Sequence, residues 1–260
     1  WILKASETGI LSAKELLAAQ ADMDSNEYNQ EFECSFESIV KGAVYSDEWQ
    51  ELVKAGRCND KVQFEPNLPT YSSWDFGIGD ATAIGIYQIN PYGQEIRLID
   101  CYEASNQKLD HFIELIKNKQ YNGSNLNFGD PSGSNRNLNT GRSIFEDLAA
   151  SNIPLFARRT HKVDQIHAVK KLLSRLHVNS NLKPFIDAIT NYHYVWDEPK
   201  GEWRNEPFHD WSSHQCDQLA YFAVNYQHAP KPLTSTEEKL KQLRNKGYGS
   251  LSVDQYIHKI

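Results

Sequence analysis

Membrane-spanning, secretory and disulfide-forming features are missing from this sequence. No apolar run approaches the ~18 residues that a membrane helix needs, and the chain does not begin with a signal-peptide pattern. Its four cysteines lie far apart and form no CxxC pair and no Cys/His spacing typical of zinc sites. We therefore expect free thiols in a reducing compartment, no zinc site and no membrane partner.

A basic net charge is missing as well. The 260 residues carry a net charge of −7, so no global positive field attracts nucleic acid. Phosphates are bound by local patches of lysine and arginine, and such a patch can exist in an acidic chain. Any contact with DNA must therefore come from a local basic cluster.

The composition is otherwise that of a globular protein. Hydrophobic residues make up 40% of the chain and charged residues 23%, which is ordinary for a packed domain. A chain of 260 residues is long enough for one sizeable core with appendages. Because it opens at Trp1, without a methionine, we expect it to be a piece of a longer polypeptide.

Three segments differ in pattern. Residues 1–60 have apolar residues at helical spacing, with Ser12 and Glu15 placed as in a capping box, and we interpret them as a helical linker segment. Residues 61–230 contain the strand patterns and most of the helix patterns, and we predict that they form the main domain. Residues 231–260 are polar and charged, as in a tail that is mobile or docked on a partner.

The main segment predicts an α/β fold with a mixed central sheet. Three β-rich runs, SSWDFGIG, ATAIGIYQI and EIRLIDCY, follow one another and are separated by turn signals. Helix and strand patterns then alternate until the final helix, SSHQCDQLAYFAVNY. This order favours three antiparallel strands, then parallel ones, with helices on the flanks.

Three aspartates lie at the ends of these predicted elements. Asp75 lies near the end of the first strand, Asp130 ends the fourth, and Asp217 lies in the first turns of the final helix. A central first strand would bring Asp75 and Asp130 side by side, and the final helix packed over the sheet would add Asp217. Close carboxylates repel one another unless cations neutralise them, and their oxygens suit Mg²⁺ or Mn²⁺. Two such ions, about 4 Å apart, can activate a water and stabilise the leaving oxygen of a phosphodiester.

Each of these carboxylates also has a simpler explanation. Asp75 can cap a loop, Asp130 can start an Asp-Pro loop, and Asp217 can complement a helix N-terminus. Asp80 lies in a Gly-Asp turn, where aspartate is common for backbone reasons, or it assists the metal ligands. We interpret His214 as part of a polar helix start, with the alternative that it orients a ligand.

Basic residues gather in a few stretches of this acidic chain. ARRTHK is the densest of them, and the helix after it places its apolar residues inward and its basic residues outward or on the flank. A solvated helix face explains this pattern, and so does a track for DNA phosphates. The candidate DNA-binding residues, here and around the loop after the fourth strand, are Arg136, Arg142, Arg158, Arg159, Lys162, Lys170 and Lys171.

The order of these motifs resembles a known family. WDFGIGDATAIGIY, NFGDPSGSNRNLNTGRSIFEDL and HDWSSHQCDQLAYFAVNY are similar to the C-terminal nuclease domain of tailed-phage large terminase subunits. TGILSAKEL, EYNQEFECSF and KGAVY are similar to the segment that joins its ATPase and nuclease domains. The resemblance implies a ribonuclease-H-like fold, with Asp75, Asp130 and Asp217 as the catalytic metal ligands and Asp80 as an auxiliary acidic position.

The resemblance also implies an activity and partners. The implied activity is a metal-dependent endonuclease that cuts concatemeric viral DNA during packaging, in the host cell cytoplasm. The implied partners are double-stranded DNA, the portal and the small terminase subunit. No GxxxxGK[ST] motif is present, so we expect the N-terminal ATPase domain of that family to be missing from this chain.

Other functions stay open. DFGIGDATAIG also fits DxGxxxTxxG, the first phosphate loop of actin-like and sugar-kinase ATP-binding proteins, although their second lobe and second Asp-Gly motif are not visible. A non-catalytic packaging module that binds DNA or a portal is another alternative. A junction resolvase or transposase-type nuclease would use the same chemistry on other DNA substrates.

Overall fold

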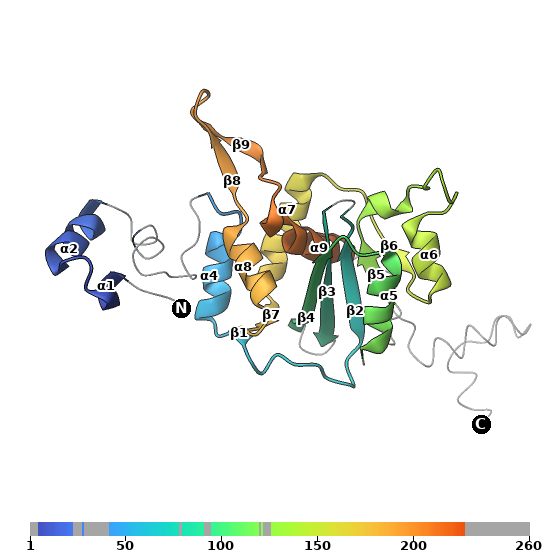
Figure 1. The fold of residues 1–260 in the computed structure, drawn as a ribbon. Helices are drawn as coiled ribbons and strands as arrows, with labels where there is room; N and C mark the ends of the chain where they lie inside the picture. Colours follow the sequence, from blue (N-terminus) through green and yellow to red (C-terminus); the bar gives the residue numbers. More distant parts are fainter. Residues whose placement is uncertain are drawn as a thin grey trace, which may run out of the picture. The chain divides into compact units, whose positions relative to one another are not determined.

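The fold is known from a computed structural model, which describes residues 5–22, 28, 42–77, 80–90, 95–119, 121 and 126–226 (Figure 1). The predicted tail, 231–260, lies outside these residues. Within the described ranges, no helix is long and apolar enough to cross a membrane. The described cysteines, Cys58, Cys101 and Cys216, are free thiols, as predicted.

A seven-stranded mixed sheet forms the centre of the fold. Its strands are β1 (Cys58–Asn59), β2 (Thr70–Asp75), β3 (Ala81–Asn90), β4 (Glu95–Ser105), β5 (Leu126–Gly129), β6 (Leu155–Phe156) and β7 (Leu176–Asn179). They are ordered β1-β7-β4-β3-β2-β5-β6. β2, β3 and β4 pair antiparallel, and β5, β6, β7 and β1 are added in parallel. The predicted ribonuclease-H-like sheet, with three antiparallel strands and then parallel ones, is confirmed.

Helices between residues 109 and 225 flank the sheet, and a separate hairpin follows its last strand. In chain order, the helices are α1 (Ala5–Thr8), α2 (Ala13–Asp22), α4 (Ser46–Lys54), α5 (Leu109–Asn118), the 3₁₀ helix η1 (Pro131–Ser134), α6 (Ile144–Ala150), α7 (Lys162–Leu173), α8 (Lys183–Asn191) and α9 (Trp211–Asn225). The hairpin consists of β8 (Tyr194–Asp197) and β9 (Glu202–Pro207). Helix α9 packs on β2, β3 and β5 and is itself contacted by α7 and α8.

The residues before position 60 contribute to two parts of the structure. In α2 the capping box is confirmed, because the Ser12 N–H donates to Glu15 Oε2 at 2.8 Å and the Glu15 N–H to Ser12 Oγ at 3.3 Å. Helix α4 and strand β1 belong to the main unit, since the Trp49 ring meets the edge of Phe185 in α8 and β1 pairs with β7. The proposed division of the chain at residues 60 and 230 stays a prediction.

Strand β2 sends its side chains alternately to the two faces of the sheet. Trp74 enters an apolar cluster with Phe112 of α5 on one face. On the other face Ser73 Oγ donates to the Gln218 carbonyl of α9, at 2.7 Å. Asp75 lies two residues after Ser73, so the alternation turns its carboxylate toward α9.

A glycine lets α9 approach the sheet closely. A Cβ at Gly85 of β3 would lie 2.2 Å from Gln218 Oε1, so any larger residue would displace the Gln218 side chain. That oxygen also accepts a hydrogen bond from the Tyr87 hydroxyl, at 2.8 Å. The Tyr87 ring stacks on Phe222, one turn further along α9, with ring centroids 3.8 Å apart. These contacts fix α9, and with it the polar residues of its first turns, against the ends of the strands.

Candidate active site

Asp75 and Asp130 lie side by side at the ends of two parallel strands. The register of β2 and β5 pairs Trp74 with Gly129, and the Asp130 N–H donates to the Trp74 carbonyl at 2.9 Å. The next residue in each strand is an aspartate. The predicted juxtaposition of these two aspartates is confirmed, while their role as metal ligands stays a prediction.

Helix α9 brings the third aspartate to the same place. Its first turn is capped by Asp210, whose carboxylate accepts the Ser212 N–H at 2.9 Å. Helical spacing then places His214, Asp217 and Tyr221 on one face of α9, since they follow one another at intervals of three and four residues. Asp217 is close enough to Asp75 for their repulsion to affect ionisation, as is Asp130. The site therefore gathers three carboxylates from β2, from the end of β5 and from α9.

Asp75 is a buried carboxyl group with a perturbed pKa. Burial, followed by repulsion from Asp217 and Asp130, raises the pKa of Asp75 to about 7 from its ordinary value of 3.8, against the opposing effect of His214. Only 9% of Asp75 is exposed, so water solvates its charge poorly. A cation nearby would favour the ionised form, because it supplies the charge compensation that solvent does not.

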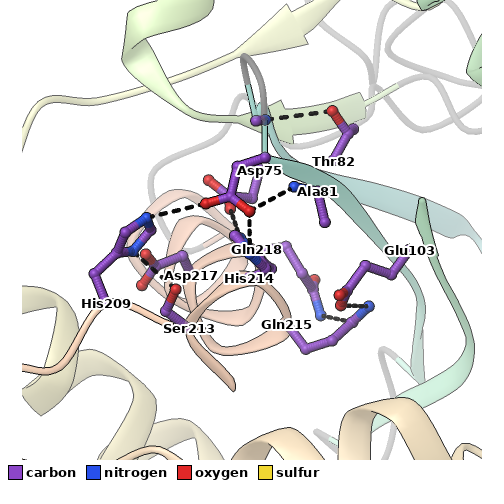
Figure 2. A network of polar contacts seen from close by, with 12 residues as sticks. Asp75, Ala81, Thr82, Glu103, His209, Ser213, His214, Gln215, Asp217 and Gln218 are labelled. Atoms are coloured by element: carbon purple, nitrogen blue, oxygen red, sulfur yellow. Dashed lines mark hydrogen bonds and ion pairs between the residues drawn. The ribbon is translucent and has the colours of Figure 1, made fainter. Parts of the chain in front are cut away.

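His214 lies between Asp75 and Asp80, and Figure 2 shows its side chain next to Asp75. Its Nδ1 is 3.6 Å from Asp75 Oδ2, its Nε2 is 3.1 Å from Asp80 Oδ1, and its side chain is 4% exposed. The interaction with Asp75, opposed by burial, raises the pKa of His214. His214 thus lies in the polar start of α9, as interpreted, and it is buried between two carboxylates. Its alternative role in orienting a ligand stays a prediction. Its position one turn before Asp217, on the same helix face, is the sequence signal that points to the site.

Asp80 and His209 extend this network toward solvent. His209 Nε2 is 3.4 Å from Asp80 Oδ2, and Ser213 Oγ lies 2.9 Å from His209 Nδ1. The backbone N–H of Ala81 donates to Asp80 at 3.0 Å, and this bond is the main cause that lowers the pKa of Asp80. Asp80 is thus a half-exposed, ionised carboxylate that contacts Asp75 through His214. Its auxiliary role stays a prediction.

Asp217 is neutralised by a lysine. Lys162, the first residue of α7, places Nζ 2.5 Å from Asp217 Oδ1, with only 14% of the Asp217 side chain exposed. The same ammonium group lies over the ring of Tyr192, 5.8 Å from its centroid. Lys162, a candidate for DNA phosphates, is therefore engaged with a carboxylate of the site.

Asp130 is held by local hydrogen bonds. Its carboxylate accepts the Ser132 N–H at 2.8 Å and the Ser132 hydroxyl, so it caps η1. Tyr221 of α9 interacts with Asp130 from the other side, and burial together with the three carboxylates raises the pKa of Tyr221 well above its usual range. Tyr221 is a site residue that the sequence analysis missed, although it lies one turn after Asp217.

The donor set fits a divalent cation, although not in its present arrangement. Among the residues that the structure describes, no three His, Cys, Asp or Glu side chains are placed to hold one metal ion. Asp217 is paired with Lys162 and Asp130 with Ser132, so both would have to turn to share an ion with Asp75. Carboxylate oxygens are the ligands that Mg²⁺ and Mn²⁺ prefer, and the lysine already marks a place that favours positive charge. Asp75, Asp130 and Asp217 are therefore the residues that could hold a metal, and this role stays a prediction.

Two of the candidate DNA-binding arginines are engaged with α6. Arg136 Nη2 lies 3.2 Å from Glu146 Oε1, and Arg142 Nε lies 2.6 Å from Asp147 Oδ1. Both pairs are exposed, so each is worth little and can open when a phosphate approaches. These pairs organise the long loop after Asp130.

The remaining candidate DNA-binding residues differ in whether they form an ion pair. Lys170 is paired with Glu48 of α4, with Nζ 3.0 Å from Oε1. Arg158, Arg159 and Lys171 are exposed and have no ion-pair partner in the described part of the chain. These three side chains can therefore bind an anion without first breaking an ion pair with a carboxylate.

Comparison with known proteins supports the fold. No protein-family model and no curated protein sequence matches the chain. Among solved structures, the large terminase from a thermophilic bacteriophage matches 87% of this chain and 54% of its own, with a TM-score of 0.57 and 17% identity. The same terminase in complex with ADP matches 84% of this chain and 53% of its own, with a TM-score of 0.56 and 17% identity. The manganese-bound nuclease domain of the large terminase from bacteriophage SPP1 matches 60% of this chain and 86% of its own, at 16% identity and a TM-score of 0.47.

These matches show a shared fold. At 17% identity, the likeness to the phage large terminase extends over most of this chain. The chain spans about half the length of that terminase. The resemblance noted in the sequence is thereby confirmed for the architecture.

Proposed function

We propose that this chain is the nuclease part of a phage large terminase and that it cuts double-stranded DNA with Mg²⁺ or Mn²⁺ as cofactor. The observation that carries the proposal is the convergence of Asp75, Asp130 and Asp217 on one face of the sheet, with Asp75 buried and its pKa raised to about 7. Three carboxylates so placed are costly for the fold unless they bind cations. The fold shared with the phage large terminase supports the same conclusion.

Divalent ions at such a site, two in the proposed mechanism, supply an activated water and charge stabilisation for the leaving oxygen. The chain itself supplies the carboxylates and the residues that position them. Asp75 is fixed at the end of β2 and shielded from solvent, so a bound cation would supply the charge compensation that water does not give the ionised carboxylate. His214 contacts Asp75, and Tyr221 and Ser132 interact with Asp130, so both carboxylates have polar partners that position them.

DNA would reach the carboxylates across the exposed basic side chains. Arg158, Arg159 and Lys171 are the proposed first contacts with backbone phosphates, because no carboxylate in the described residues occupies them. Arg136 and Arg142 would join after release from α6, and Lys162 and Lys170 after release from Asp217 and Glu48. Phosphate contacts of this kind position a strand without reading its sequence.

The proposed biological role is the cutting of concatemeric viral DNA during genome packaging, in the host cell cytoplasm. On this proposal the portal, the small terminase subunit and the ATPase part of the large subunit are its partners. The length of the matched phage terminase, about twice that of the aligned part, is consistent with a further functional part outside this chain.

A plasmid-nicking assay tests the proposal. The wild-type chain should relax supercoiled plasmid in Mg²⁺ or Mn²⁺ and leave it intact in EDTA. Asp75→Asn, Asp130→Asn and Asp217→Asn should each lower the rate by at least about a hundredfold, because each removes a charged ligand. Asp187→Asn, at an exposed carboxylate on α8, should cut like the wild type.

Full activity of the Asp75→Asn protein would overturn the proposal. DNA binding without nicking in any divalent metal would favour the non-catalytic packaging module instead. ATP binding in the absence of DNA, measured by titration, would favour the actin-like alternative.

A further inference from the structure

A polar pocket opens beside Asp130. It has a volume of about 360 Å³ and lies between η1 and the segment that leads into α7. Asp130, Asn135, Arg159, Thr160, Gln165 and Tyr221 are among the residues that line it. A volume of this order lies at the small end of ligand sites, and it suits a phosphate with part of its sugar better than a whole cofactor.

The lining of this pocket offers hydrogen-bond donors. Arg159 is exposed and has no carboxylate partner among the described residues, and the Asn135 amide likewise makes no side-chain bond to another described residue. Gln165 Nε2 donates to Thr160 Oγ1 at 3.3 Å, which leaves the second hydrogen of that amide for a ligand. A guanidinium fork and two amides facing a cavity are the groups that recognise phosphate oxygens.

Asp130 also lines the pocket and has the opposite charge. A phosphate in this pocket would meet the Asp130 carboxylate, and the two anions would repel each other in the absence of a cation. A divalent ion on Asp130 would reverse the sign of the charge at that point. The pocket is therefore suited to an anion only when the neighbouring metal site is filled.

We propose that this pocket binds a backbone phosphate of the DNA strand, next to the phosphate that is cut, and that Arg159 is its principal ligand. The proposal rests on the proposed nuclease function, because it needs a cation at Asp130. Arg158 provides the comparison within the chain: it is adjacent, equally charged and exposed, and it does not line the pocket. If the basic side chains attracted DNA only through their charge, Arg158 and Arg159 would contribute equally to binding. If the pocket binds a phosphate, Arg159 contributes more in the presence of a metal.

Binding of a short fluorescent DNA duplex, followed by anisotropy at constant ionic strength, tests this inference. Each protein is titrated in EDTA and in Ca²⁺, and the ratio of the two dissociation constants gives the enhancement due to metal. In Ca²⁺, Arg159→Gln should weaken binding about tenfold, the effect of one charge-assisted contact. In EDTA it should change binding by less than about twofold, so the enhancement is lost. Arg158→Gln should weaken binding by the same factor in both conditions and keep the enhancement.

A second variant and the cleavage assay complete the test. Asn135→Ala should also reduce the enhancement, and it removes no charge. Equal losses for Arg159→Gln and Arg158→Gln in both conditions, or an unchanged enhancement in Arg159→Gln, would overturn the inference. If that happened while the wild type nicked plasmid in Mn²⁺, the pocket proposal would fail and the nuclease proposal would stand. If the wild type nicked no plasmid in any metal, the nuclease proposal would fail and the pocket proposal with it.

Discussion

Lys162 Nζ lies 2.5 Å from Asp217 Oδ1, so a residue of α7 supplies positive charge to the carboxylates gathered by β2, β5 and α9. The pair is mostly buried, with 26% of the lysine side chain and 14% of the aspartate side chain exposed. On the proposed function, this lysine supplies part of the positive charge that a metal ion would bring. It would also compete with that ion, because a metal on Asp217 would have to displace the ammonium group.

Replacement of Lys162 by Gln should therefore have opposite effects without and with metal. In EDTA the variant should lose about 2 kcal/mol of stability, because Asp217 keeps a buried charge without its partner. In Mn²⁺ the variant should gain more stability than the wild type does, because no ammonium competes for Asp217. Thermal unfolding at several Mn²⁺ concentrations measures both effects.

Lys171→Gln serves as the control, since Lys171 lies on the same helix, is exposed and lacks an ion-pair partner in the described ranges. It should leave stability within about 0.5 kcal/mol of the wild type. An unchanged Mn²⁺ response in Lys162→Gln would show that Asp217 does not bind the metal.

The raised pKa of Asp75 predicts how stability depends on pH without metal. In the unfolded chain Asp75 ionises at its ordinary pKa of 3.8, and in the folded protein at about 7. Between these values the folded state binds more protons, so stability falls as pH rises and levels off above about pH 7. His214 acts in the same direction, because its raised pKa gives stability that is lost as pH rises through the folded value.

Urea denaturation in EDTA between about pH 5 and 8 should show this decline in the wild type. Asp75→Asn should reduce the dependence of stability on pH, because the amide does not titrate and His214 loses one of its charged partners while it keeps Asp80. In Asp187→Asn, stability should decline with pH as steeply as in the wild type. If Asp75→Asn and the wild type declined in parallel, Asp75 would not be a buried acid.

The fold could be predicted from local sequence patterns to a large extent. The three β-rich runs around Asp75 gave the antiparallel strands, because alternation and turn residues are properties of short segments. The placement of Asp130 beside Asp75 followed from the strand order alone, since parallel neighbours end at one edge of a sheet. These relations need no knowledge of how the helices dock.

The contacts made by side chains across helices could not be predicted. Lys162 fits the basic run of its own helix, and only the packing of α7 against α9 directs it to Asp217. His214 lies in a polar helix start by sequence, and only the position of α9 on the sheet buries it. The pairing of Arg136 and Arg142 with α6 depends on how one long loop folds back.

Gly85 is the position on which the docking of α9 depends most sharply. Gly85→Ala should cost about 1–3 kcal/mol, the range for overpacking a core, because the new Cβ would lie 2.2 Å from Gln218 Oε1. Displacement of Gln218 also breaks its hydrogen bond with Tyr87. Gly129→Ala should cost less, since its Cβ would meet the flexible end of Leu155 at 3.2 Å. Equal stability of the two variants in urea would contradict this assignment.

His214 should support metal binding without touching the metal. It opposes the rise in the pKa of Asp75, so removing it should leave more Asp75 protonated at neutral pH. His214→Ala should weaken Mn²⁺ binding about 10- to 100-fold, the usual effect of losing a partner of a metal ligand. His209→Ala is the matched control, because His209 is largely exposed and meets Asp80 alone among the carboxylates of the site, and it should cost less than about threefold.

A change of pH can show why His214→Ala loses Mn²⁺ affinity. It separates an effect on the ionisation of Asp75 from an effect on packing. If His214 acts by keeping Asp75 ionised, a higher pH deprotonates the carboxyl group in the variant and recovers much of the Mn²⁺ affinity, because ligands must be deprotonated to bind. If His214 acts only as packing, the affinity stays low at every pH. Isothermal titration of Mn²⁺ into both histidine variants, at neutral and at raised pH, distinguishes these outcomes. A loss in His209→Ala as large as in His214→Ala would instead assign the effect to Asp80.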